Sequence, residues 1–375
     1  MTSRHDSLLT PLSDANLRAA VLESMGTTIQ LSKSFTVVEA VSFKRSYQEA
    51  FAQNPDLKEI ILDFANTTFI DSSGIGVLVI CHKFCEARGA KMRLMNLPSQ
   101  VMMALSLTEL DKIFHIDSGS APSSDPHCAQ LADEPSAQPA SQPTSKRASK
   151  QASKWASKQA SKLQSALENL PETHPSVRSK AKRLMDIVGA LVGLVLTAVL
   201  FVVVAIAIKR EDGGPIFFAQ TRCSWMGKRF KIWKFRSMVT DAEARKREVA
   251  NKVEGPLFKN DQDPRITRIG RFLRRTSLDE FPQFWNVLKG DMSLVGTRPP
   301  TPDEIEQYEV SQWQRLNVKP GMTGEWQVNG RSSVTTFEEV IQLDLEYQRK
   351  WSLMYDIQLI IKTVLVLFSK KSGAM

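Results

Sequence analysis

The chain has 375 residues and a formal net charge of +9, from 49 lysines and arginines against 40 acidic residues. This length suits two or three domains. A hydrophobic fraction of 42% and a charged fraction of 24% exclude a fully disordered chain, a collagen and a polytopic membrane protein. The four cysteines are too few and too scattered for the disulfide framework of a secreted protein, so we expect a reducing, cytosolic setting.

The positive charge is unevenly distributed along the chain. Residues 1–120 carry −2, residues 121–180 carry +3 and residues 181–375 carry +8, with +6 between Thr221 and Thr240 alone. Nucleic acid, a membrane surface and a phosphorylated substrate are all partners that such a basic region would attract. A solvated basic face with no partner is the alternative.

The first region, residues 27–117, is predicted to be a small α/β domain that follows an N-terminal extension, residues 1–26. Alternating or compact apolar runs indicate strands, and apolar residues at helical spacing indicate helices. The strands are expected at 28–31, 59–64 and 91–97, and the helices at 37–52, 74–88 and 101–107. Strands that alternate with helices predict a mixed or parallel sheet covered by helices.

Residues 118–178 are rich in Ser, Ala, Pro and Gln and are predicted to be a low-complexity linker. Within it, Ala148 to Leu163 contains four tandem copies of Ala-Ser-Lys-x. A solvated linker is the favoured interpretation of this repeat. A weak attraction of its lysines to anionic lipid headgroups is the alternative.

An uncharged apolar stretch of 22 residues, Ile187 to Ile208, lies between the basic pairs Lys182-Arg183 and Lys209-Arg210. As a helix it would measure ~33 Å, enough to span a bilayer. Because positive charge favours the cytoplasmic side and flanks both ends, a re-entrant helix fits equally well. Such a helix must break near its middle, where proline is absent and the available positions are Gly189, Gly193 and Thr197.

The densest polar segment ends in two adjacent acids, Asp279 and Glu280. Five arginines, a residue type suited to phosphate recognition, precede them: Arg265, Arg268, Arg271, Arg274 and Arg275. Thr276 or Ser277 is a candidate cap for a helix whose first turn would hold both acids. An ionised carboxylate there can act as a nucleophile and its neighbour can bind a divalent cation, as phosphoryl transfer requires. Simple helix capping is the alternative.

Other signals are weaker. No phosphate-binding glycine loop is present, and no histidine lies in the C-terminal half. Cys81 and Cys85 share a helix face, where burial in the core is favoured over zinc binding. The apolar stretch Met354 to Phe368 fits an amphipathic helix at a membrane interface as well as it fits a buried helix.

The C-terminal half, about Lys182 to Lys371, closely resembles the bacterial sugar transferases, which are monotopic phosphoglycosyl transferases acting on polyprenol phosphate. Several long motifs occur in the family's order. They are Lys182-Arg-Leu-Met-Asp186, Gly214-Pro-Ile-Phe-Phe218, Lys234-Phe-Arg-Ser-Met238, Asp263-Pro-Arg-Ile-Thr-Arg-Ile-Gly270, Arg275-Thr-Ser-Leu-Asp-Glu280, Trp285 to Gly296, and Gly324 to Arg331.

The resemblance implies that sugar-1-phosphate passes from a UDP-sugar to undecaprenyl phosphate, with release of UMP. Asp279 would attack the phosphate next to the sugar and form an aspartyl-phosphosugar intermediate, and Glu280 would help to bind Mg²⁺. The predicted phosphate-binding residues are Arg274, Arg298, Arg265, Arg236 and Lys234. The family's membrane helix is re-entrant, although Thr197-Ala198 stands here where many members have Ser-Pro, and Thr297 replaces the usual proline before Arg298.

The N-terminal domain, about Thr27 to Ile116, resembles STAS domains through the segment Phe69-Ile-Asp-Ser-Ser-Gly-Ile-Gly-Val-Leu78. In regulatory members of that family the serine after the aspartate is phosphorylated, which here is Ser72. A phosphate at a helix start would change the docking surface by about two charges. A passive adaptor domain, with Ser72 only capping a helix, is the alternative.

The expected fold is α/β: a STAS-type mixed sheet with helices, a linker, and a mostly helical transferase domain at 179–375 with a re-entrant helix at 187–208. The predicted location is the bacterial inner membrane, monotopic, with both domains facing the cytoplasm.

The expected partners are a UDP-sugar, undecaprenyl phosphate, membrane lipids and a STAS-binding regulatory protein or kinase; nucleic acid is not expected, and a homodimer is left open. The expected function is the initiation of cell-surface glycan synthesis of the exopolysaccharide or O-antigen type. The alternative is a membrane-anchored STAS scaffold with an inactive transferase half.

Overall fold

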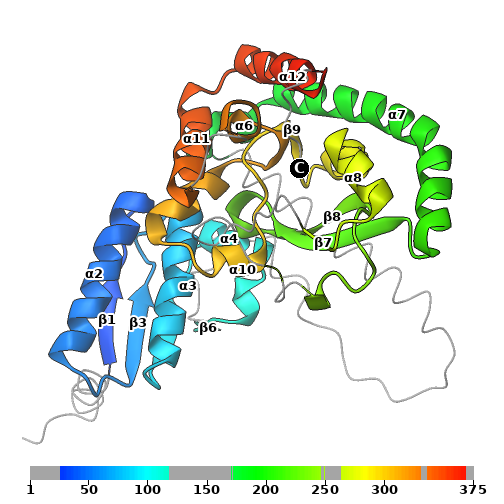
Figure 1. The fold of residues 1–375 in the computed structure, drawn as a ribbon. Coiled ribbons are helices and arrows are strands. Elements are labelled where there is room, and N and C mark those ends of the chain that lie inside the picture. The colour runs from blue at the N-terminus through cyan, green and yellow to red at the C-terminus, as the bar shows by residue number, and fades with distance from the viewer. Residues whose placement is uncertain are drawn as a thin grey trace, which may run out of the picture.

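A parallel four-stranded sheet forms the centre of the N-terminal domain (Figure 1). The structure, a computed structural model, describes residues 26–117, 170, 172–245, 249, 263–330 and 336–368. The strand order is β1-β3-β5-β6, with all neighbours parallel. The strands are β1 (Gly26–Gln30), β3 (Glu59–Asp63), β5 (Lys91–Met95) and β6 (His115–Ile116), beside a short pair, β2 (Ser34–Phe35) and β4 (Phe69–Ile70).

Helices pack on this sheet because their apolar residues recur at helical spacing. Helix α2 (Val37–Gln53) buries Ala40, Phe43, Tyr47 and Phe51 along one face. Helix α3 (Ser72–Glu86) begins at Asp71, whose side chain accepts hydrogen bonds from the amides of Ser73 and Gly74. Helix α4 (Ser99–Leu107) and the 3₁₀ turn η1 (Leu110–Lys112) complete the domain. Its predicted α/β class is confirmed.

The C-terminal half is mostly helical and includes many short elements. Its strands form a hairpin, β7 (Phe217–Cys223) with β8 (Arg229–Phe235), and a parallel pair, β9 (Ser293–Val295) with β10 (Gly321–Thr323). The α-helices are α6 (Pro175–Arg178), α7 (Lys180–Asp212), α8 (Arg268–Arg275), α9 (Phe284–Lys289), α10 (Pro302–Ile305), α11 (Phe337–Lys350) and α12 (Leu353–Phe368). Short 3₁₀ helices are η2 (Trp225–Gly227), η4 (Leu278–Gln283) and η5 (Val310–Asn317), and η6 (Trp326–Gly330) is a π-helix.

Helix α7 is one continuous helix of 33 residues that contains the predicted apolar stretch and bends visibly along its length (Figure 1). Among the described residues it is the one helix long and apolar enough to cross a membrane. The Thr197 hydroxyl donates to the Gly193 carbonyl at 2.7 Å, a bond of the kind that bends helices without proline. One face of α7 is apolar and exposed, at Leu184, Val188, Leu191, Val192, Val195, Leu196, Val199, Val202, Val203 and Ile206.

Buried polar side chains fix the start of α7 to the rest of the C-terminal half. The Lys182 ammonium lies 2.6 Å from the Asp356 carboxylate of α12 and also donates to the Val295 carbonyl. The Asp186 carboxylate accepts from the Ser293 hydroxyl and the Leu294 amide, both at 2.9 Å. Helix α12 therefore lies beside α7, with its own apolar residues exposed at Met354, Ile357, Ile361, Val364 and Leu365. It has both an exposed apolar face and buried residues, and its place at a membrane interface stays a prediction.

The predicted linker lies mainly outside the described residues, as do the Ala-Ser-Lys repeats and the first 25 residues. The last residues of the predicted linker are folded: α6 packs with the C-terminal half, and the His174 ring bonds to the Gln348 carbonyl at 3.0 Å. Cys81 and Cys85 are buried in the core, as predicted. That core is continuous between the two halves, since Trp313 and Leu316 of η5 join the same buried cluster as Ile75 of α3.

Candidate active site

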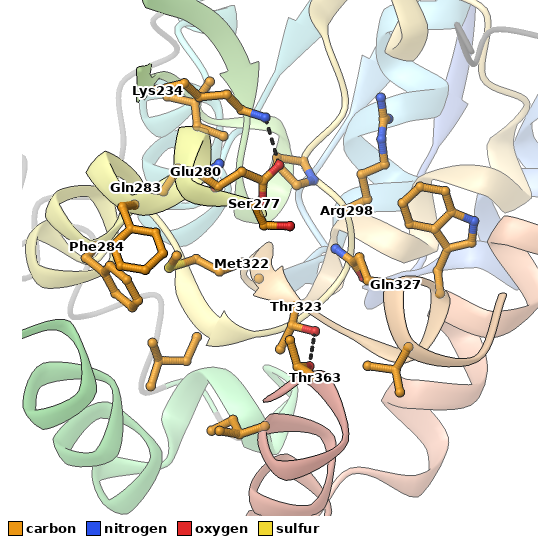
Figure 2. A pocket seen from close by; sticks show the side chains of 18 of the residues that line it. Lys234, Ser277, Glu280, Gln283, Phe284, Arg298, Met322, Thr323, Gln327 and Thr363 are labelled. Atoms are coloured by element: carbon orange, nitrogen blue, oxygen red, sulfur yellow. Dashed lines mark hydrogen bonds and ion pairs between the residues drawn. The ribbon is translucent and has the colours of Figure 1, made fainter. Parts of the chain in front are cut away.

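A cavity of about 450 Å³ lies in the C-terminal half between the β7–β8 hairpin, η4, the strands β9 and β10, and α12 (Figure 2). Its polar wall holds Arg222, Lys234, Ser277, Glu280 and Arg298. Its apolar wall holds Phe284, Leu294, Met322, Ile360, Val364 and Val366. The cavity therefore joins a region of positive charge to an apolar region that reaches α12.

Each cation of the polar wall has an anionic or carbonyl partner. The Lys234 ammonium lies 3.0 Å from the Glu280 carboxylate. The Arg298 guanidinium donates twice to Glu304, at 2.8 and 3.3 Å. Arg222 donates to the Pro299 carbonyl at 3.0 Å, and burial lowers the pKa of its guanidinium to about 10. These pairs hold the three cations in place around the cavity.

Asp279 lies in η4 beside these residues and is 6% exposed. Burial raises the pKa of its carboxyl above the usual 3.8, while the positive charges of Lys234 and Arg274 oppose that rise. Asp279 is not one of the residues that line the cavity, although Ser277, Glu280 and Phe281 around it are. The carboxylate is thus held in a low-dielectric position next to the cavity wall.

Ser277 occupies the N-cap position of this helix, as predicted, but its side chain makes no capping hydrogen bond. Helix α8 ends at Arg275, Ser277 adopts a left-handed conformation with φ of 55°, and η4 begins without a hydrogen bond from a capping side chain. A non-glycine residue in this conformation costs ~1–2 kcal/mol, so the turn before Asp279 is strained. The acids do lie in the first turn of η4, as expected.

The remaining predicted phosphate-binding residues lie outside the cavity lining. Arg274 donates from Nε to the Ser237 hydroxyl at 2.9 Å, and its charge acts on Asp279. Arg265 is buried against Asp263, 2.6 Å away, and Arg236 pairs with Asp212 at the end of α7. Arg265 and Arg236 thus each have a short contact to a carboxylate of the C-terminal half. Their predicted contact with phosphate stays a prediction.

Several cavity residues were missed by the sequence reasoning. Arg222 belongs to the basic segment that the charge count singled out, so its position carried a signal. Gln327 in the cavity wall lies within the motif Gly324 to Arg331, whereas Glu304, which holds Arg298 from outside the cavity lining, carried no signal. Thr323 of β10 and Thr363 of α12 share a hydrogen bond of 2.6 Å at the edge between the polar and apolar walls (Figure 2).

Glycines of α7 allow the apolar wall to lie close to the helix. A Cβ atom on Gly189 would lie 2.5 Å from the Leu294 side chain, and one on Gly193 would lie 2.4 Å from the Phe284 ring. Phe284 and Leu294 line the cavity and rest directly on α7. The cavity wall is thus built on the long apolar helix.

Ser72, the predicted phosphorylation site, lies far from this cavity in sequence and is fully buried. Its amide and its hydroxyl both donate to the side-chain oxygen of Asn317, a residue of η5 that sequence reasoning did not identify. The structure therefore places Ser72 at the contact between the two halves.

An α/β domain is thus joined to a helical domain that carries a basic cavity and a long exposed apolar helix, as in membrane-associated proteins. The chain belongs to the bacterial sugar transferase family, whose shared sequence pattern matches residues 177–370. Residues 16–121 match the STAS domain.

Named relatives cover the transferase half. Galactosyl transferase CpsE of Streptococcus agalactiae is 50% identical over 188 residues, which are 50% of this chain and 42% of the relative. UDP-glucose:undecaprenyl-phosphate glucose-1-phosphate transferase of Escherichia coli is 43% identical over 199 residues, 51% and 41% of the two chains. Exopolysaccharide production protein ExoY of Rhizobium meliloti is 36% identical over 190 residues, 49% of this chain and 84% of the relative. This chain thus spans less than half the length of the first two relatives.

Proposed function

We propose that the protein transfers sugar-1-phosphate from a UDP-sugar to undecaprenyl phosphate and so initiates synthesis of a cell-surface glycan. The observation that carries this proposal is the cavity with two walls. Arg222, Lys234 and Arg298 supply positive charge for a diphosphate or lipid phosphate. The opposite wall is apolar and reaches α12, which suits the hydrocarbon chain of a lipid. The relative from Escherichia coli is named for this substrate pair, which supports the proposal.

Asp279 is the proposed nucleophile. Its carboxylate oxygen attacks the phosphorus next to the sugar, the bond to the bridging oxygen breaks, and UMP leaves with that oxygen. An oxygen of undecaprenyl phosphate then attacks the same phosphorus and releases the Asp279 carboxylate. Lys234 and Arg274, whose charges already act on Asp279, support its ionised form. Arg298 and Arg222 hold the phosphates in line for both steps.

Mg²⁺ is the proposed cofactor, and Glu280 would help to hold it. No cluster of three or more His, Cys, Asp or Glu side chains in the described part of the chain is arranged to bind a metal. A carboxyl group beside a phosphate site still fits, because Mg²⁺ commonly takes one or two carboxylates together with substrate phosphates. Bound Mg²⁺ would neutralise the charge of the diphosphate.

The proposed location is the cytoplasmic face of the bacterial inner membrane, with α7 as a re-entrant helix. The exposed apolar faces of α7 and α12 and the bend of α7 support this placement. Cysteines introduced at Lys180 and Arg210, near the two ends of α7, should react with a membrane-impermeant reagent from the same side of the bilayer. Labelling from opposite sides would contradict the re-entrant arrangement.

The activity is tested with full-length protein, undecaprenyl phosphate, Mg²⁺ and a panel of labelled UDP-sugars, with release of UMP as the readout. Asp279→Asn should lower the rate at least ~10³-fold, since the amide cannot act as the nucleophile. Asp303→Asn, at an exposed aspartate, is the matched control and should keep the rate. With UDP-sugar alone, the sugar label should remain on the wild-type protein and be absent from Asp279→Asn.

Full activity of Asp279→Asn would contradict the nucleophile assignment. If the wild-type protein released no UMP from any UDP-sugar, the alternative of a membrane-anchored scaffold would replace the transferase. The regulatory partner or kinase of the STAS domain and a homodimer stay predictions.

A further inference from the structure

The Asn317 side chain of the transferase half makes hydrogen bonds to residues at the start of helix α3. The Ser72 amide donates to Asn317 Oδ1 at 3.1 Å, and the Ser72 hydroxyl donates to the same oxygen. The Asn317 amide group in turn donates to Asp71 Oδ2 at 3.2 Å. Because Ser72 is fully buried, these bonds form away from water and depend on the two halves staying together.

A second contact fits the same helix closely to the transferase half. A Cβ atom on Gly76 would lie 2.4 Å from the Trp313 ring, so only glycine lets α3 come this near. Trp313 is 4% exposed and belongs to the core that continues from one half into the other. At the rim, the Lys83 ammonium lies 3.5 Å from the Glu306 carboxylate. The contact is therefore specific in shape as well as in hydrogen bonding.

The segment that packs against α3, η5, also makes hydrogen bonds to residues beside the cavity. Arg315, two residues before Asn317, is fully buried and donates to the Tyr308 hydroxyl, to Asp344 and, at 3.3 Å, to the Arg298 carbonyl. The Thr297 hydroxyl donates to the Arg315 carbonyl at 3.2 Å. Two hydrogen bonds thus join η5 to the residues that position the Arg298 side chain in the cavity.

The N-terminal domain does not itself line the cavity, whose lining residues all lie between Arg222 and Val366. We propose that the docked N-terminal domain acts on the cavity through η5: α3 holds Asn317 and Trp313, and η5 holds Arg298 through Arg315. Asn317 and Arg315 are then positioning residues for a phosphate-binding arginine. The predicted change in KM rests on the proposed transferase function, whereas the structural coupling between the two halves does not.

The variant Asn317→Asp breaks the contact with little change in shape. The new aspartate side chain keeps an oxygen that can accept from Ser72. Its second oxygen faces the Asp71 carboxylate, to which the Asn317 amide donates in the wild-type protein. The double variant Asp71→Asn with Asn317→Asp restores the bond with donor and acceptor exchanged. Asn66→Asp, at an exposed position of the N-terminal domain, is the control for an added charge.

Full-length protein in nanodiscs is compared by hydrogen exchange and by kinetics. Asn317→Asp should speed amide exchange in α3 and at Thr297 and Arg298. It should raise KM for UDP-glucose or UDP-galactose by roughly 5- to 150-fold, the usual range of coupling between two sites, with a smaller change in kcat. The double variant should return both readouts to near the wild-type values, which loss of folding would not allow.

Binding is reciprocal, so UDP added to the wild-type protein should slow exchange in α3. If α3 opens in Asn317→Asp while exchange at Thr297 and Arg298 stays unchanged, the coupling is refuted. If α3 stays protected in both Asn317→Asp and Gly76→Val, these contacts do not hold the halves together, and the inference is also wrong. A wild-type protein that shows the exchange coupling but releases no UMP would refute the transferase function alone.

Discussion

The two halves of the molecule are held together by different interactions. In the N-terminal domain the ion pairs of the described residues lie at the surface, as between Arg93 and Glu59. In the transferase half, charged pairs such as Lys182–Asp356 and Arg315–Asp344 are almost fully buried. The N-terminal domain instead relies on a dense apolar core around Ile60, Leu78 and Leu94.

This contrast shows how the transferase half keeps its shape with short elements. Regular strands and helices bury wide apolar faces, whereas 3₁₀ turns such as η4 and η5 offer little area for hydrophobic packing. Buried ion pairs add little net stability, but removing one partner leaves a costly unpaired charge. We infer that these pairs select one arrangement of the segments around the cavity. The following experiments test this contrast.

Breaking a buried pair should have the largest effect. Lys182→Met leaves the Asp356 carboxylate, which is fully buried, without its cation. We expect the free energy of unfolding of the transferase half to fall by ~3–5 kcal/mol, measured by chemical denaturation of the full chain in nanodiscs. Lys180→Met, at an exposed lysine of the same helix, is the control and should have little effect. If Lys182→Met were as mild as Lys180→Met, the pair would not fix α7 to α12.

A core truncation in the other half should be slightly less costly. Leu94 is fully buried in the central strand β5, so Leu94→Ala leaves a cavity. We expect a loss of about 3 kcal/mol, seen as faster amide exchange across β1, β3 and β5. Leu94→Met, which nearly conserves volume, should cost less than ~1.5 kcal/mol. Equal effects of the two variants would mean that packing at this position does not limit stability.

Acid should reduce the proposed activity through Asp279. Because burial raises the pKa of this carboxyl, it gains a proton at a higher pH than an exposed aspartate does. The protonated form is not a nucleophile, so kcat/KM should fall about tenfold per pH unit below that pKa and reach a plateau above it. Lys234→Gln removes a charge that lowers the pKa of Asp279, so it should move the acid limb to higher pH. If the acid limb of the pH profile did not move, the titrating group would be one other than Asp279.

Breaking a surface pair should have the smallest effect. The Arg93 guanidinium lies 2.7 Å from the Glu59 carboxylate, with 40% of the Arg93 side chain exposed. Arg93→Ala should lower the free energy of unfolding by less than ~1 kcal/mol, and added salt should remove most of the difference. A loss comparable with that of Lys182→Met would remove the contrast between the two halves.

The sequence predicted the N-terminal domain well because its periodicity is regular. Expected strands such as 59–64 and helices such as 37–52 agree with the structure to within a few residues. The predicted C-terminal limit of the helix at 74–88 was less accurate, since α3 ends at Glu86. The sheet could be expected to be mixed or parallel, but only the structure gives its order, which depends on contacts between distant segments.

The candidate site was predicted only in part. The charge count and motif order led to Glu280, Lys234 and Arg298, which line one cavity, and to Asp279, which lies next to its wall. The left-handed turn at Ser277 could not be foreseen, because serine there gives no local signal. The contact of Asn317 with Ser72 joins residues 245 positions apart, and no local pattern encodes such a distance.

The burial of Ser72 has a consequence for any molecule that competes for this face of α3. A regulatory protein or a modifying enzyme can reach the serine only in the fraction of molecules whose halves have separated. Its apparent affinity is therefore its intrinsic affinity multiplied by that open fraction. The contact between the halves thus raises the concentration at which a competitor would occupy half of the protein.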